Sequence, residues 1–283
     1  MSGLSVTPRR LSKPPPGGVW VYRLSMRWIQ LAFSLLAVTM TLGALAAHRP
    51  VPETVHRATE LTEQVDTLVA VAPPDAALAS DAVVVDAAHS VVKVTNTAYS
   101  CQTIMSGSGF VVAKDRVMTN AHVVAGADTV TVSLDGQDLD ATVVAYDPAA
   151  DISILQVPGL QAPPLEFAHG SAWRGTDAVV LGYPGGGPFV AYPARVRGVI
   201  DLNSPDIYRT TTITREVYTI RGNVRRGDSG GPLIDRDGRV LGMNFGAAVH
   251  DPEMGFVLTT NQLYPHAIDS DRSEPVATGA CVR

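Results

Sequence analysis

The sequence predicts an all-β domain, built as a barrel or a sandwich, that follows one N-terminal transmembrane helix. From about residue 81 to residue 283, short runs rich in Val, Ile and Thr recur at short intervals, with Gly, Asp, Asn and Pro between them. No long amphipathic helix interrupts these runs, which argues against a doubly wound sheet with crossover helices. The 25 glycines and 20 prolines, with aromatic residues at only 6%, fit many short strands joined by turns.

The N-terminal segment, residues 1–27, is basic. It holds five Arg and Lys side chains, and no Asp or Glu occurs before Glu53. Residues 28–47 are apolar, with Gln30 as their only strongly polar member. Twenty helical residues rise about 30 Å, which is enough to cross the hydrocarbon core of a bilayer. Because basic flanks stay in the cytoplasm, we expect 1–27 to be cytoplasmic, 28–47 to be a single-pass membrane anchor and the rest to be exported.

Two other interpretations of the apolar run compete with the anchor. A buried core helix would show a polar face at 3.6-residue spacing, and residues 28–47 show none. A cleaved signal peptide is the stronger alternative, since Ala44-Leu45-Ala46 is a small-residue site of the right kind. The run is longer than the roughly 7–15 apolar residues of a signal peptide, which favours the anchor. Either interpretation places the domain on the periplasmic or cell-wall side of the membrane.

Residues 48–80 form a predicted linker, or stalk, between the helix and the domain at 81–283. Pro50 and Pro52 open this segment, and a Pro-Pro pair at 73–74 lies near its end. The residues between them allow a short helix, and we expect the stalk to be able to contact the domain.

The charge pattern argues against nucleic acid as a partner. The formal net charge is -5, and the second half of the chain contains no concentrated basic block. Two cysteines without CxxC or HxxxH spacing do not make a zinc site, so the sequence predicts neither a metal nor another cofactor. It indicates no particular oligomeric state.

Three segments contain candidate catalytic residues. They are TNAHVV around His122, DPAADISIL around Asp151 and GDSGGPL around Ser229. A serine hydroxyl needs a base within hydrogen-bond reach to become a nucleophile, and a histidine can accept and return that proton near neutral pH. A buried carboxylate then fixes the useful tautomer of the ring and stabilises the imidazolium. Glycines beside the serine let backbone N–H groups approach a developing oxyanion.

At these three segments the sequence resembles the trypsin/chymotrypsin-like serine peptidases. The resemblance covers about residues 91–260, and GDSGGPL with both partners upstream is a highly specific signal. It implies two six-stranded antiparallel β-barrels with the site in the cleft between them, and a serine endopeptidase that acts on proteins or peptides. It also implies that the N–H groups of Gly227 and Ser229 form the oxyanion hole.

The wider layout is similar to that of the membrane-anchored periplasmic acid-resistance proteases of mycobacteria and related actinobacteria. The similar segments are SCQTIMSGSGFVVAKDRVMTNAHVVAGAD, REVYTI, GDSGGPLID and GFVLTT, with a late cysteine. This resemblance implies a role in envelope stress or acid resistance. Those proteases carry a membrane domain of several helices, whereas this chain has one apolar segment.

The two cysteines, Cys101 and Cys281, lie 281 − 101 = 180 positions apart. Export would place them where a disulfide can persist, and no third thiol competes for either. The resemblance to the actinobacterial proteases points the same way. We therefore expect one disulfide that ties the C-terminal tail to the start of the first barrel.

Three alternatives to the proposed triad need to be weighed. Asp147 competes with Asp151 for the role of the carboxylate, but Asp147 precedes a proline and is typical of a turn. The GDSGG motif also fits the α/β-hydrolases, which need an acid and then a histidine after the serine and a helix after the motif. Only His250 and His266 follow Ser229, and no helical periodicity follows the motif. A catalytically idle, protease-shaped binding or sensing module is the competing functional class, and the intact triad argues against it.

Further residues of the predicted site are less well defined. Asp228 is expected to be a buried structural charge, with Arg225 or Arg221 as its candidate partner. The segments 219–226 and Gly255-Phe256-Val257 are expected to line the primary pocket. So is the strand Asn244, Phe245 and Gly246. These segments contain no clearly placed acid, so a preference for Lys or Arg is not supported, and their glycines suggest room for an apolar side chain.

Overall fold

The structure, a computed structural model, describes residues 71–268 and 272–282. The predicted cytoplasmic segment (1–27), the predicted transmembrane helix (28–47) and most of the predicted linker lie outside the described residues. Within the described ranges, no helix is long and apolar enough to span a membrane.

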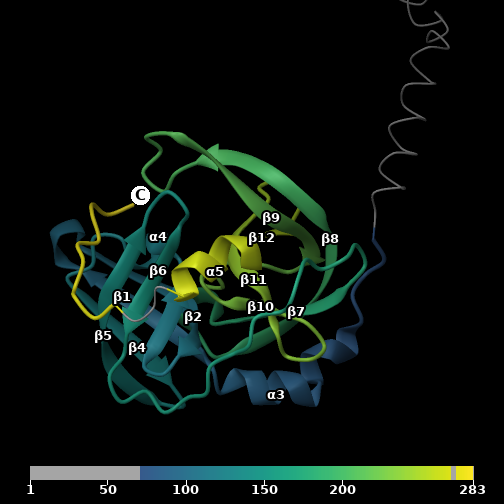
Figure 1. The fold of residues 1–283 in the computed structure, drawn as a ribbon, viewed down its shortest axis with the longest axis horizontal. Helices are drawn as coiled ribbons and strands as arrows, with labels where there is room; N and C mark the ends of the chain where they lie inside the picture. Colours follow the sequence, from purple (N-terminus) through teal and green to yellow (C-terminus); the bar gives the residue numbers. More distant parts are fainter. Residues whose placement is uncertain (1–70, 269–271, 283) are drawn as a thin grey trace, which may run out of the picture. The chain divides into compact units, whose positions relative to one another are not determined.

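Two six-stranded antiparallel sheets make up the domain, and in each the last strand of the order pairs back to the first (Figure 1). The first has the order β1-β2-β3-β6-β5-β4 and the second β10-β11-β12-β9-β8-β7. The first sheet contains β1 (Val91–Ala98), β2 (Thr103–Ala113), β3 (Arg116–Thr119), β4 (Thr129–Leu134), β5 (Gln137–Asp147) and β6 (Ile152–Gln156). The second contains β7 (Asp177–Gly182), β8 (Val190–Pro205), β9 (Thr212–Gly222), β10 (Pro232–Ile234), β11 (Val240–Ala247) and β12 (Met254–Thr259). The predicted all-β class with two six-stranded antiparallel sheets is confirmed.

Alternation of apolar side chains explains why these segments form closed barrels. In the first barrel Val94 lies opposite Val132, and both are fully buried. In the second barrel Val196 lies opposite Ile220, again with both side chains buried. β-Branched side chains fit such pleated, half-buried surfaces, and the cross-strand pairs fix the register.

One apolar cluster contains side chains from both barrels and joins them. It contains Phe110 and Met118 from the first barrel, and Leu181, Met243 and Leu258 from the second. Because this core is shared, residues on facing edges of the two barrels are held at defined positions.

Strands β8 and β9 form a long hairpin that extends beyond the second barrel (Figure 1). Its turn is closed by the carboxylate of Asp206, which accepts hydrogen bonds from the N–H groups of Tyr208 and Thr210 and from the Thr210 hydroxyl. The tip reaches the first barrel, where the Tyr208 hydroxyl lies 2.6 Å from that of Tyr146. It also reaches the C-terminal tail, where the Tyr208 hydroxyl donates to the carbonyl of Thr278.

Helices occupy little of the fold. They are η1 (Ala76–Ser80), α3 (Ala82–Ala88), η2 (Tyr99–Cys101), α4 (Ala121–Val124), η3 (Pro184–Gly186) and α5 (Thr260–Ile268). The described end of the predicted linker packs on the domain, since Leu78 of η1 is buried and Val71 accepts a hydrogen bond from the Arg221 guanidinium.

Helix α5 (Thr260–Ile268) follows the GDSGG motif although its sequence shows no helical periodicity. It contains Pro265, and only Thr260 and Leu263 along it are buried. Tyr264 and Ile268 remain exposed. An apolar stripe at 3.6-residue spacing is therefore missing from the sequence of α5, and the helix docks mainly through Leu263 in the core shared by the barrels.

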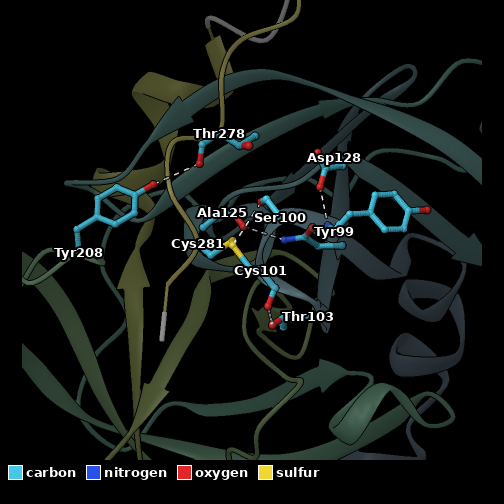
Figure 2. Close-up of a disulfide and its surroundings, with 10 residues drawn as sticks. Tyr99, Ser100, Cys101, Thr103, Ala125, Asp128, Tyr208, Thr278 and Cys281 are labelled. Carbon is cyan, nitrogen blue, oxygen red and sulfur yellow. Dashed lines mark hydrogen bonds between the residues drawn. A yellow bond between two sulfur atoms is a disulfide. The ribbon is translucent and has the colours of Figure 1, made fainter.

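A disulfide joins Cys101 to Cys281, the pair named in the sequence analysis, with a Cα–Cα distance of 6.6 Å (Figure 2). The tail that carries Cys281 is also held by backbone hydrogen bonds, because Gly126 donates to Thr278 and Val276 donates to Val143. Gly126 has a positive φ of 66°, and a Cβ there would lie 2.5 Å from the Cys281 sulfur. The tail is thus fastened along the first barrel at three places.

Candidate active site

A cavity of about 940 Å³ is lined by residues of both barrels and contains the three predicted catalytic side chains. His122 and Asp151 come from the first barrel, and Ser229 comes from the turn before β10 of the second. The structure therefore brings His122 and Ser229 into one cavity although they are separated by more than 100 positions.

His122 lies on the single turn α4, directly after β3, and the Asp151 carboxylate holds it at two points. The backbone N–H of His122 donates to Oδ1 of Asp151 over 2.9 Å, and the ring Nδ1 lies 2.8 Å from Oδ2. The side chains of His122 and Asp151 are 24% and 6% exposed. With Nδ1–H donating to the carboxylate, Nε2 of a neutral ring is left as a proton acceptor.

Two opposing effects set the protonation of His122. Burial of the ring would lower its pKa, but the charge of Asp151 and the hydrogen bond to it act in the other direction, and the pKa lies above the ordinary 6.5. The imidazolium is therefore stabilised at this site, as a general base requires once it has taken a proton.

Asp151 itself adopts a left-handed backbone conformation, with a φ of 62°. This conformation costs an L-residue about 1–2 kcal/mol, so surrounding contacts must hold it. The side chain of Asp147 accepts hydrogen bonds from the N–H groups of Ala149 and Ala150, and the Asn120 amide donates to the Asp151 carbonyl. Of the two competing carboxylates, Asp151 contacts His122, whereas Asp147 closes the turn that leads to it.

Glycine is required at two positions of the Ser229 turn. Gly227 has a φ of 101°, and a Cβ there would lie 2.4 Å from the backbone nitrogen of Gly185. Gly230 has a φ of 85°, and a Cβ there would lie 2.2 Å from the carbonyl oxygen of Ser108. The Gly-Asp-Ser-Gly-Gly motif therefore reflects close backbone approaches on both sides of the serine.

The carbonyls of this turn accept hydrogen bonds from defined donors. Gly185 N–H donates to the carbonyl of Arg226, the Ser108 hydroxyl donates to that of Gly227, and Ser108 N–H donates to that of Ser229. In contrast, no acceptor among the described residues takes the N–H groups of Gly227 and Ser229. Two unbonded N–H groups beside a serine can bind an anionic oxygen.

Asp228 is fully buried beside Ser229, as expected, but neither candidate guanidinium pairs with it in the described part of the chain. The backbone N–H of Arg225 donates to its Oδ2, while Oδ1 has no partner there. The Arg225 guanidinium lies over the ring of Tyr192, and that of Arg221 pairs with Glu253. Burial raises the pKa of Asp228 to about 6, against the smaller lowering effects of the Arg225 backbone hydrogen bond and charge.

The residues expected to line the primary pocket take different places. Phe245 lines the cavity, and the space beside Gly246 is open. Asn244 is fully buried, and its amide donates to the carbonyl of Gly231, so it braces the Ser229 turn. Gly255 offers no free room, because a Cβ there would lie 2.5 Å from the side chain of Val224.

Two contributors to the site were not identified from the sequence. Ser108, on β2 of the first barrel, bonds the Ser229 turn of the second barrel through both its hydroxyl and its N–H. Arg215, on β9, is only 2% exposed and lines the cavity. The one signal for Arg215 is a charged residue at a position of the strand alternation that points inward, together with Val217. No cluster of three or more His, Cys, Asp or Glu side chains within 71–268 and 272–282 is placed to hold a metal ion.

Comparisons with known proteins show the family to which this fold belongs. Residues 107–243 match the family described as "Trypsin-like peptidase domain". The crystal structure of the active form of the Rv3671c protease from M. tuberculosis superposes with a TM-score of 0.74 at 53% identity, covering 76% of this chain and 95% of that chain. The chain belongs to the trypsin-like serine proteases. The inactive form of the Rv3671c protease superposes with a TM-score of 0.65 at 52% identity, covering 71% of this chain and 99% of that chain.

Two curated members of this protease family show how far the similarity extends. Serine protease Rv3671c of Mycobacterium tuberculosis is 53% identical over 216 residues, which are 76% of this chain and 54% of that protein. A probable periplasmic serine endoprotease, DegP-like, of Halomonas elongata is 36% identical over 145 residues, which are 49% of this chain and 28% of that protein. The chain thus spans about half the length of Rv3671c and less of the DegP-like protease.

The buried Asp228 generates a prediction for stability. A carboxylate whose pKa is raised from 3.8 to about 6 binds its proton more tightly in the folded than in the unfolded state, so it lowers the free energy of unfolding as pH rises from 4 to 6. We expect Asp228→Asn to remove this contribution, with a slope of at most about 1.4 kcal/mol per pH unit. Denaturant unfolding at several pH values, with the exposed Asp140→Asn as a control, measures the difference. Parallel stability curves for Asp228→Asn and the wild type would contradict the prediction.

Proposed function

We propose that the chain is a serine endopeptidase that cleaves peptide bonds in proteins or peptides through an acyl-enzyme on Ser229. The observation that carries the proposal is the contact of 2.8 Å between His122 Nδ1 and the Asp151 carboxylate, in the same cavity as Ser229. The three side chains have the types and the chain order found in the trypsin-like family, and each has the burial that its role needs.

The chemistry follows from these positions. Nε2 of His122 takes the proton of the Ser229 hydroxyl as its oxygen attacks the carbonyl carbon of the scissile bond. The resulting oxyanion is stabilised by the unbonded N–H groups of Gly227 and Ser229, and the imidazolium by Asp151. His122 then gives the proton to the leaving amine. A water molecule, activated in the same way, hydrolyses the acyl-enzyme and regenerates the free serine.

The competing proposal is a protease-shaped module that binds without cleaving. Such a module would be expected to lack at least one of the three catalytic residues. Here His122, Asp151 and Ser229 are all present, and the Ser229 turn has two N–H groups without an acceptor among the described residues. The geometry therefore supports catalysis over simple binding.

The experiment that tests the proposed function is covalent labelling of the purified full chain with a fluorophosphonate, which modifies only activated serines. We expect one label, on Ser229, and we expect Ser229→Ala to lose both the label and cleavage of a protein substrate by at least about 10³-fold while it keeps its fold. Ser133→Ala, on β4 and outside the cavity, serves as the matched control. A folded Ser229→Ala protein that retains more than a tenth of the wild-type cleavage would contradict the assignment.

We also propose that the domain works outside the cytoplasm, on a single-pass anchor at 28–47, in envelope stress or acid resistance. The basic segment 1–27, the apolar run after it and a disulfide of the kind that persists in oxidising compartments support this location. The DegP-like relatives are named as periplasmic. The acid-resistance role rests on the resemblance to the actinobacterial proteases.

The proposed topology predicts which part of the chain an external protease reaches. In intact spheroplasts, we expect added protease to degrade the domain that carries Ser229 and to spare a tag placed before residue 28, because the basic N-terminus stays inside. A cytoplasmic marker protein controls for leakage. Full protection of the domain would contradict the orientation.

A further inference from the structure

We propose that Arg215 is a positioning residue for the triad. From the second barrel, it holds the Asp151 loop, residues 148–151 between β5 and β6 of the first barrel. This proposal rests on the proposed function, because Asp151 is the triad carboxylate. Arg215 lies on β9 of the second barrel, and its guanidinium donates to the carbonyl of Ala149, two residues before Asp151. The same group donates to the Ser204 hydroxyl over 2.7 Å and to the Pro205 carbonyl over 3.3 Å.

The guanidinium thus connects the β8–β9 hairpin of the second barrel to the Asp151 loop of the first barrel. A planar group with five donors can span three acceptors that lie in different directions, which an ammonium cannot match. Because Arg215 is only 2% exposed, these contacts replace the hydration of its two terminal nitrogens, while its buried Nε has no partner among the described residues. Arg215 pairs with no carboxylate within residues 71–268 and 272–282. A buried charge of this kind is costly unless its hydrogen bonds are kept, so the Ala149 contact is strongly favoured.

Two further contacts from the same hairpin follow the chain that leads into the Asp151 loop. The Tyr208 hydroxyl lies 2.6 Å from that of Tyr146, and the N–H of Ile207 lies 3.5 Å from the carbonyl of Pro148. The hairpin therefore contacts residues 146, 148 and 149 in succession. Arg215 makes the last of these contacts, nearest to Asp151.

The first barrel alone does not hold the loop from this side. From within the first barrel, the Asp147 carboxylate accepts a hydrogen bond from the N–H of Ala149, and the Asn120 amide donates to the carbonyl of the left-handed Asp151. Arg215 supplies the contact from the second barrel. If the Ala149 carbonyl is released, Asp151 can relax from its left-handed conformation, and its carboxylate turns away from the His122 ring. Loss of the contact between Arg215 and Ala149 should therefore change the pKa of His122 and slow the chemical step.

The direction in which the pKa of His122 changes distinguishes a positioning role of Arg215 from a simple effect of its charge. Asp151 raises the pKa of His122, so a displaced carboxylate should lower that pKa towards or below 6.5. Removal of a nearby positive charge would by itself raise the pKa of His122. Arg215→Met removes both the positive charge and the hydrogen-bond donors. Arg215→Lys keeps the charge but lacks the planar guanidinium with its several fixed donors. We expect a lowered pKa in both variants.

Both variants keep the other charged or titratable side chains near His122 chemically unchanged. Asp206, Arg209 and Arg226 line the same cavity, and Asp151 contacts the ring directly. Tyr146 lies behind the loop, and its pKa is raised by burial, by its contact with Tyr208 and by the charge of Asp151.

The test measures the pH titration of the His122 ring by NMR and the rate of fluorophosphonate labelling in the full chain. For Arg215→Met we expect labelling slower by about 100-fold, the usual effect of a misplacement of about 1 Å, together with a lowered His122 titration midpoint. Arg215→Lys should recover part of the rate. Arg239→Met, which removes a half-exposed arginine that precedes β11 of the same barrel, is the matched control.

Each outcome bears on the proposal. A folded Arg215→Met protein with the wild-type midpoint, or a raised one, would overturn it even if labelling were slower, because a purely structural role predicts that result. If Arg215→Met does not fold, the same criteria apply to Arg215→Lys. If the wild type takes no label, the proposed function fails, while the titration midpoints of the variants still decide the role of Arg215.

Discussion

The structure depends on one constraint, that the carboxylate of Asp151 must meet the His122 ring although the backbone of Asp151 is in an unfavourable conformation. The carboxylate accepts from both the ring and the backbone of His122, so its placement fixes the tautomer and the orientation of the imidazole together. A left-handed aspartate persists only where neighbouring groups over-determine it. Here those groups come from the preceding turn, from Asn120 and from the opposite barrel through Arg215.

The serine side of the site is likewise held from across the cleft. Ser108 of the first barrel bonds two carbonyls of the Ser229 turn, and its hydroxyl accepts a hydrogen bond from the N–H of Tyr183. Neither barrel therefore builds its half of the site unaided. This reciprocal support, with the apolar core shared between the barrels, explains how two closed sheets can hold the three predicted catalytic residues in one cavity.

Those features of the site that lie in contiguous motifs could be predicted from the sequence. The sequence predicts His122, Asp151 and Ser229 as catalytic because each lies in a motif whose residue types indicate that chemistry within a few positions. The strands were identified because their apolar alternation is local. The choice of Asp151 over Asp147 also followed from local chemistry, since a residue before proline tends to close a turn.

The features that the sequence did not predict depend on contacts between distant segments. Arg215 resembles any charged residue in a strand until the fold buries it against Ala149. Val224 fills the space that Gly255 suggested for a substrate side chain, and Asn244 is turned inward to brace the Ser229 turn. Helix α5 lacks a periodic apolar face and is held by the core shared between the barrels. In each case the deciding neighbour is remote in the chain, so no local pattern encodes it.

The most direct measurement of the central claim, that Asp151 and His122 act as one base for Ser229, is the rate of Ser229 labelling by a fluorophosphonate between pH 4 and 9. Because the neutral ring is the base and Asp151 raises its pKa, the rate should rise with pH through a midpoint above 6.5. Such a midpoint also differs from that of the neighbouring Asp228, whose pKa is about 6. A rate that is flat across this range, or a midpoint well below 6.5, would contradict the claim.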